Sequence, residues 1–160
     1  LPQNIVVLRG LCEFYAVPGL RLGFAVANPD LAHRLRTILP PCNVNCFATA
    51  AGQHLHGDED FAAHTQTQLK AEREAMVTAL SDIPGLRPLT GSANFLLVKV
   101  DTAGGMNATQ WNDALKSHGV RVCNGARFRG LDNSVMRVAV RNRLENQRLI
   151  AGLRAVRRKM

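Results

Sequence analysis

The chain has 160 residues, 46% of them hydrophobic, and carries a formal net charge of +8. This composition predicts a folded globular protein with one core, or one core and an appended fragment, and excludes a disordered chain. The longest apolar stretches, 5–8 and 95–98, are far shorter than the roughly 20 residues that cross a bilayer, so we expect no membrane partner.

The first half of the chain predicts two strands followed by three helices. A β-branched run at 4–9 is typical of a buried strand, and the apolar run that leads to Val26 predicts a second strand. Helical spacing of apolar residues then predicts a helix at 31–39 and another from Asn45 onwards. A third helix, at about 60–80, is long enough to join two parts of a larger molecule.

The second half of the chain predicts a small sheet and two more helices. Its elements are, in chain order, a buried strand at 94–100, a helix capped by Asn107 or Thr109 that stops at Gly119, strands at 120–123 and 135–140, and a helix at 144–157. This order predicts an α/β fold in which helices cover a small sheet.

Four sequence blocks carry a resemblance to a known family. Residues 10–23 read GLCEFYAVPGLRLG, and ten of these fourteen positions match the lysine segment of fold-type-I pyridoxal-phosphate enzymes, SLTKFYALPGLRLG. The blocks PCNVN at 41–45, SANFLL at 92–97 and RFRGLD at 127–132 with MRVAVRNRLEN at 136–146 follow in the family's order. The chain therefore resembles the C-terminal part of the class I/II aminotransferases, and is most similar to threonine-phosphate decarboxylase, which serves cobalamin side-chain synthesis, and histidinol-phosphate aminotransferase.

The resemblance implies a domain organisation as well as a fold. We expect residues 1–40 to be a remnant of the large cofactor-binding domain, and residues 41–160 to be the small α/β domain with its long connecting helix. The family also implies a cytoplasmic location and a homodimer for the full-length parent. Its ligands are pyridoxal 5′-phosphate as cofactor and an amino acid or a phosphorylated amine as substrate.

By the same resemblance, four residues fall at cofactor positions. Glu13 stands where the family lysine forms a Schiff base with the cofactor; a carboxylate has no amine for this bond, although it can accept a proton beside a noncovalently held cofactor. Arg21 matches the arginine that binds the cofactor phosphate. Gly10 and Cys12 replace hydroxyl residues of the motif, so two further phosphate contacts are lost or weakened.

Substrate positions fall later in the chain. Arg137 matches the arginine that receives the substrate α-carboxylate, or is a strand arginine at a solvent edge. Asn43 and Asn45 either orient the substrate or close the turn after the Pro-Pro pair. Arg127, in the loop before the strand of Arg137, can meet a substrate phosphate or be solvated.

Other readings of the sequence stay open. We expect no metal, because Cys42 and Cys46 lack a second Cys or His pair at finger-like spacing and are better explained as reduced thiols. We expect this chain to be inactive by itself, as part of a decarboxylase or aminotransferase whose lysine is lost. The alternative is a noncatalytic pseudoenzyme that keeps the fold for dimerisation or partner binding. The basic residues of the last twenty positions predict a solvated helix face rather than a nucleic-acid site, because no aromatic residues are interleaved with them.

Overall fold

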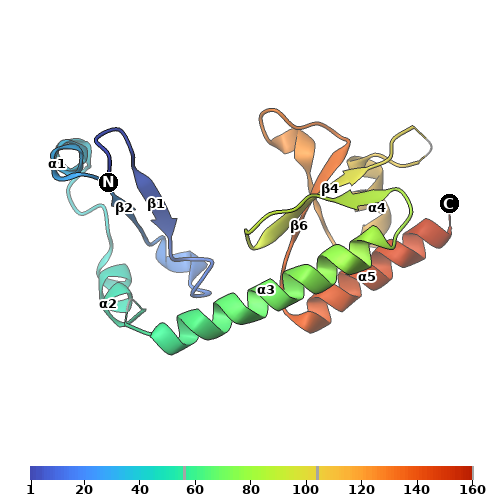
Figure 1. Cartoon of the computed structure of the whole chain (residues 1–160), viewed down its shortest axis with the longest axis horizontal. Helices are drawn as coiled ribbons and strands as arrows, with labels where there is room; N and C mark the ends of the chain where they lie inside the picture. The colour runs from blue at the N-terminus through green and yellow to red at the C-terminus, as the bar shows by residue number, and fades with distance from the viewer. Residues whose placement is uncertain (56, 104, 160) are drawn as a thin grey trace. The chain divides into compact units, whose positions relative to one another are not determined.

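The computed structural model describes residues 1–55, 57–103 and 105–159, and the chain forms two compact units, 1–65 and 66–160 (Figure 1). The boundary between them falls inside the long helix α3, Glu59–Ser81, and each unit is described by itself. Among the described residues, no helix combines the length and the apolar character needed to span a membrane.

The N-terminal unit contains a two-stranded ribbon and short helices. Its elements are β1 (Val7–Gly10), the 3₁₀ helix η1 (Pro18–Leu20), β2 (Gly23–Val26), α1 (Pro29–Ile38), α2 (Cys46–Leu55) and the first residues of α3. The strands pair antiparallel, with Gly10 opposite Gly23. Asn28 begins α1, because its side-chain oxygen accepts the backbone N–H of Leu31 at 2.9 Å, and Pro29 fits the first helical position.

The β1–β2 ribbon corrects one prediction. The run at 4–9 was expected to be a buried strand, yet every residue of both strands is exposed, with Leu8 at 77% and Phe24 at 46%. The strand itself is also shorter than predicted, starting at Val7. An apolar strand needs cover on both of its faces, and two paired strands cannot supply it for each other.

The C-terminal unit is a four-stranded antiparallel sheet with helices against it. The sheet order is β3-β4-β6-β5, from strands β3 (Leu86–Pro88), β4 (Phe95–Val100), β5 (Cys123–Asn124) and β6 (Val135–Ala139). The helices are α4 (Ala108–Lys116), α5 (Arg143–Arg158) and the remainder of α3, and Figure 1 shows α3 and α5 running side by side. This architecture confirms the predicted α/β fold with helices on a small sheet.

One face of the sheet forms the core with the helices. Leu96 and Val98 of β4 lie opposite Val138 and Met136 of β6, and all four side chains are buried. The helical side of this core consists of Met76 and Leu80 of α3, Trp111 and Leu115 of α4, and Leu149, Ile150, Leu153 and Val156 of α5. Strand β4 was predicted to be buried as a whole, but Phe95 and Leu97 on its other face are only half-buried.

Two further differences concern the strands. The short strand β3 was not predicted. The strand expected at 120–123 begins only at Cys123, because the backbone N–H of Val122 donates to the side-chain oxygen of Asn112 on α4 at 3.0 Å. The helix predicted between these strands starts where Asn107 forms a reciprocal cap with Gln110, as expected from its side chain.

Candidate functional site

The segment that joins β1 to β2 is closed by its own backbone. Leu11 donates its N–H to the carbonyl of Leu22 at 3.0 Å, which extends the ribbon pairing by one residue. Beyond it, Tyr15 donates to Leu11 at 3.1 Å, and Val17 donates to Cys12 at 2.7 Å. These bonds form a compact turn that leaves the side chain of Glu13 exposed.

The thiol of Cys12 is turned into this turn. The residue is 4% exposed; its Sγ accepts the N–H of Leu22 at 3.0 Å and donates to the carbonyl of the same residue at 3.3 Å. The sulfur thus both donates to and accepts from the backbone of one residue, Leu22. The Cys12 side chain therefore links the two ends of the segment by hydrogen bonds.

The carboxylate of Glu13 lies over Gly10. A Cβ built on Gly10 would be 3.6 Å from Oε2 of Glu13, which is an ordinary van der Waals distance. A side chain therefore fits at position 10, and the space above it is bordered by a negative charge.

Arg21 ends η1 in an unusual backbone conformation. Its φ is +53°, in the left-handed region that non-glycine residues rarely occupy, and its side chain is exposed. One guanidinium nitrogen, Nη1, donates to the carbonyl of Pro18 at 3.1 Å. The bond orients the guanidinium on its own turn and leaves further N–H groups to bind an anion.

These four positions do not fit a covalently held pyridoxal phosphate. Glu13 offers no amine for the aldehyde, Gly10 offers no hydroxyl for the phosphate, and the thiol of Cys12 is bonded internally. Arg21 is the one residue of the four that keeps the donor chemistry a phosphate requires.

An aromatic cluster beside this turn was not found by sequence reasoning. The rings of Tyr15 and Phe61 stack with centroids 5.5 Å apart, and Phe14 meets Tyr15 edge-on at 5.0 Å. The cluster connects the turn to the start of α3 within the N-terminal unit. Phe61 is far from the turn in the sequence. Its apolar side chain was therefore the one feature of the sequence that could have indicated this contact.

Asn45 bonds in two directions in the same unit. Its Oδ1 accepts the N–H of Ala48 at 2.8 Å, which caps α2, and its Nδ2 donates to the carbonyl of Leu20 at 3.1 Å. It thereby fixes the start of α2 to the end of η1, next to Arg21. Asn43 is exposed in the preceding turn, beside Cys42, whose φ is +58°.

Arg137 lies on the face of the sheet opposite the core. It is half-buried on β6, between Leu97 of β4 and Cys123 of β5, which are its register partners. Its guanidinium carbon lies 4.3 Å from the centroid of the Phe95 ring. A guanidinium carries its N–H donors in a planar fork that matches the two oxygens of a carboxylate.

Arg127 lies at the end of the 3₁₀ helix η2, Gly125–Arg127, and is exposed, as is Arg129. Gly125 fixes this helix against β6, because a Cβ there would come within 2.6 Å of the carbonyl oxygen of Val135. On the preceding residue, the Asn124 amide donates to the side chains of Thr109 and Asn133, both at 2.7 Å.

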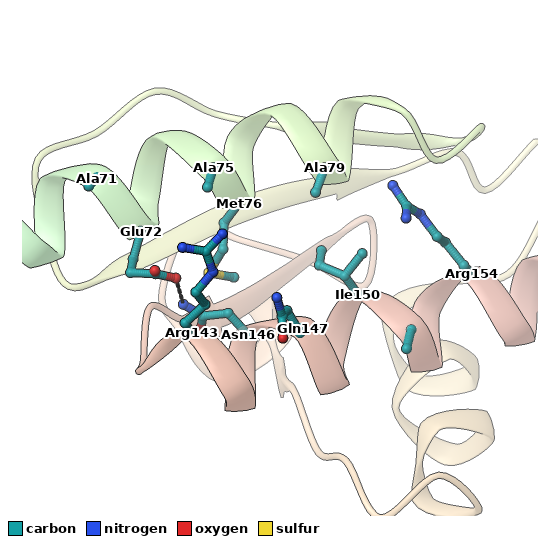
Figure 2. A pocket seen from close by; sticks show the side chains of 11 residues that line it. Ala71, Glu72, Ala75, Met76, Ala79, Arg143, Asn146, Gln147, Ile150 and Arg154 are labelled. Atoms are coloured by element: carbon teal, nitrogen blue, oxygen red, sulfur yellow. Dashed lines mark hydrogen bonds between the residues drawn. The ribbon is translucent and has the colours of Figure 1, made fainter.

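The C-terminal unit has a groove between α3 and α5 that was not predicted from the sequence. It encloses about 480 Å³ and is lined by alanines of α3, by Ile150 and by polar residues of α5 (Figure 2). At one end, the buried Asn146 donates to Glu72 at 2.9 Å. Figure 2 shows the guanidinium groups of Arg143 and Arg154 turned from α5 toward α3.

The predicted site residues divide between the two units. Gly10, Cys12, Glu13 and Arg21 fall together on the β1–β2 connection, and Asn45 bonds beside it; Arg127 and Arg137 belong to the C-terminal unit. Within the described residues no group of three or more His, Cys, Asp or Glu side chains has the arrangement of a metal site.

Comparison with known proteins identifies the family. The aminotransferase class I and II family matches residues 2–153. The threonine-phosphate decarboxylase of Salmonella typhimurium is 35% identical over 154 residues, which are 96% of this chain and 41% of that protein. The chain thus spans about two fifths of the length of this relative and of a putative threonine-phosphate decarboxylase of Caldanaerobacter subterraneus.

Solved structures agree with this match. The histidinol-phosphate aminotransferase of Clostridium acetobutylicum has a TM-score of 0.91 at 24% identity, over 99% of this chain and 47% of that chain. The histidinol-phosphate aminotransferase of Sinorhizobium meliloti, solved in complex with pyridoxal-5′-phosphate, has a TM-score of 0.80 at 23% identity, over 98% of this chain and 42% of that chain. At these identities the structures show a shared fold, and the family match over nearly the whole sequence shows that this chain belongs to the aminotransferase class I and II family.

Proposed function

We propose that the chain is the C-terminal portion of a pyridoxal-phosphate-dependent decarboxylase or aminotransferase-like protein that acts on an amino acid or a phosphorylated amine. The observation that carries the proposal is the geometry of Arg137. Its guanidinium carbon lies 4.3 Å from the centroid of the Phe95 ring, on the sheet face opposite the core. A planar fork fixed in this way suits a carboxylate.

The other matched residues take supporting roles in this proposal. Arg21 would bind a phosphate at the end of the β1–β2 connection, and Asn45 positions that end through its bond to Leu20. Arg127 would meet a second anionic group of the substrate from its exposed position, and Asn43 would orient the substrate from the turn before α2. In this proposal residues 1–40 are a remnant of the large cofactor-binding domain, and residues 41–160 are the small domain with its long connecting helix.

Glu13 makes this chain inactive by itself in the proposal, because its carboxylate cannot replace the lysine amine. A homodimer and a cytoplasmic location are proposed for the full-length parent on the same family grounds. The threonine-phosphate decarboxylase of Salmonella typhimurium, of which this chain covers 41%, can supply an N-terminal part for a test.

The test is a chimera in which the N-terminal part of that relative precedes this chain. With Glu13→Lys, the chimera should bind the cofactor covalently and show an absorbance band above about 400 nm. The chimera that retains Glu13 is the matched control and should show no such band. Absence of the band in the Glu13→Lys chimera, when that protein is folded by circular dichroism, would reject the proposed function.

A second candidate is a noncatalytic member of the family that uses the fold to bind a partner. Three cofactor positions, Gly10, Cys12 and Glu13, have changed in one segment, and the thiol of Cys12 is bonded to Leu22. These changes favour the noncatalytic function. It predicts that the native chain binds no vitamin B6 phosphate in a saturable manner. Saturable binding with turnover would exclude it.

A further inference from the structure

The groove between α3 and α5 follows two helices that run in the same direction. At one end, Asn146 of α5 donates to Glu72 of α3 at 2.9 Å. Toward the other end, a guanidinium nitrogen of Arg154 on α5 lies 3.9 Å from the carboxylate of Asp82, the residue after α3. Both helices therefore advance along the groove together, and each forms one of its walls.

Between its ends the groove is apolar. The buried side chains of Met76 and Ile150 are part of its lining. The other apolar residues of the lining are alanines from both helices, namely Ala71, Ala75, Ala79 and Ala151. Because alanine side chains are small, a third helix can approach such walls closely and place its own side chains between them.

Two arginines of α5 flank this apolar stretch. Arg143 and Arg154 are exposed, and Figure 2 shows both guanidinium groups turned toward α3. They are separated by 11 positions, which is three helical turns or about 16 Å along the axis, so they lie on the same side of α5. None of the described residues of the lining is aromatic, so the groove offers no stacking platform for nucleic-acid bases.

The distribution of charge favours an anionic partner for this unit. From residue 66 onwards the chain has sixteen lysines and arginines against seven aspartates and glutamates, whereas residues 1–65 have four against five. Helix α5 alone has five arginines and one glutamate. A surface of one sign attracts partners of the other sign and increases the rate of their encounter.

We propose that this groove binds an acidic amphipathic α-helix of another protein. One face of that helix presents small or apolar side chains to the alanine walls, and carboxylates three turns apart pair with Arg143 and Arg154. The acidic residue of the lining, Glu72, is already bonded to Asn146. The contact of Arg154 with Asp82 is long and joins two exposed groups, so a carboxylate of the partner can replace it at little cost. The inference is independent of the proposed function, because it uses none of the residues assigned to cofactor or substrate.

The experiment is fluorescence anisotropy of a labelled synthetic peptide titrated with the whole chain. The peptide is an alanine-rich helix of about 20 residues, a length at which isolated helices form, with two glutamates three turns apart and leucines between them on the same face. The control peptide has the same composition, with the two glutamates on opposite faces. We expect saturable binding of the first peptide and binding of the control that is about five-fold weaker, because one exposed ion pair is lost. Added salt should reduce the difference.

Variants locate the binding in the groove. Arg143→Gln and Arg154→Gln should each weaken binding of the first peptide by up to a factor of about five. Arg148→Gln changes the charge of α5 equally at an exposed position outside the lining and should change the affinity little. Ala75→Gln places a long side chain in the groove and should abolish saturable binding, whereas Thr78→Gln, exposed on α3 outside the lining, should not. Circular dichroism checks that each variant is folded.

Three results would overturn the inference. The first is equal affinity for the two peptides, or binding that survives Ala75→Gln. The second is binding of the peptide to this chain but not to the chimera, which would assign the groove to the N-terminal part of the parent. The third is failure of the peptide to bind while single-stranded DNA binds and is lost in Arg143→Gln and Arg154→Gln, which would assign the groove to nucleic acid. None of these results concerns the absorbance band that tests the proposed function.

Discussion

The guanidinium of Arg137 stacks on the ring of Phe95, with 4.3 Å between the guanidinium carbon and the ring centroid. The two residues are diagonal neighbours on one face of the sheet, since Phe95 is opposite Ala139 and Arg137 is opposite Leu97. The helices cover the other face, so this contact fixes the arginine on the side of the sheet that carries no core.

The stacking predicts a measurable coupling between the two side chains. In a double-mutant cycle with Arg137→Gln and Phe95→Leu, we expect a coupling free energy of about 0.5–1 kcal/mol. Urea unfolding followed by the fluorescence of Trp111, which is buried in the core of the same unit, gives the stabilities. Arg87→Gln, on the neighbouring strand β3, is the control and should show no coupling to Phe95→Leu; equal coupling for both arginines would contradict the assignment.

Asn146 should contribute strongly to the stability of the C-terminal unit. Its Oδ1 accepts the N–H of Arg141 at 2.9 Å, and its Nδ2 donates to the carbonyl of Arg141 at 2.8 Å and to Glu72 at 2.9 Å. Asn146→Ala removes all three bonds of this buried side chain, so we expect a loss of about 2–3 kcal/mol, at about 1 kcal/mol for each bond. Gln147→Ala, exposed on the same groove, should change the unfolding midpoint little, and a similar loss in both variants would argue against the role of these bonds.

Asn45 and Asn43 form a matched pair in the N-terminal unit. Asn45→Ala removes the cap of α2 and the bond to Leu20, and should destabilise this helix by about 1–2 kcal/mol. Asn43→Ala, in the exposed turn, should be close to neutral. Hydrogen exchange of the Ala48 amide is the measurement, because Asn45 is its acceptor. Equal exchange rates in both variants would show that the cap contributes nothing.

The pKa of Asp132 should lie below its ordinary value of 3.8, because the hydroxyl of Ser134 and then the backbone N–H of Ser134 donate to its carboxylate, with Lys99 adding a smaller effect. The folded-state pKa is the lower one, so the linked stability is fully present above the unfolded-state pKa. It is lost as pH falls through the folded-state pKa.

An NMR titration of the Asp132 carboxyl carbon measures this shift. Ser134→Ala should raise the pKa toward 3.8, because the hydroxyl bond is the largest cause. Ser117→Ala, which removes a hydroxyl at the end of α4, should leave it unchanged. A titration midpoint that stays the same in Ser134→Ala would contradict the stated cause.

The two glycines that face each other in the ribbon should respond differently to substitution. A Cβ at Gly23 would lie 2.8 Å from the carbonyl oxygen of Arg9, so Gly23→Ala forces the strands apart and should cost about 1–3 kcal/mol. Gly10→Ser meets only Glu13 at 3.6 Å and should be tolerated. Hydrogen exchange of the Leu11 amide, which bonds across the ribbon to Leu22, compares the two variants; equally fast exchange in both would refute the steric argument.

Helix starts could be predicted because their signals are local. Asn107, one of the two expected caps of α4, carries the capping side chain at the boundary itself, and this cap is present. The start of β5 could not be predicted in this way, because Asn112 on another element takes the N–H of Val122. The exposure of β1 likewise depends on what packs against it rather than on its own sequence.

The candidate site was predictable in its residue types and only partly in its geometry. The strand of Arg137 follows from the apolar run around it, but its ring partner is 42 positions earlier and is brought beside it by strand register. The inward orientation of the Cys12 side chain depends on its hydrogen bonds to the backbone of Leu22, ten residues later. The groove depends on Asn146 and Glu72, which lie on two different helices and are 74 positions apart in the sequence.

The β1–β2 ribbon has a practical consequence for handling the protein. Its apolar side chains are in contact with water on both faces, and the outer edges of its two strands carry backbone groups that another strand can pair with. Contact with another apolar surface, including that of a neighbouring molecule, removes these side chains from water. The time before a solution becomes turbid should therefore depend more steeply on protein concentration than on temperature. Dilution should dissociate the aggregates until strands of different molecules have paired.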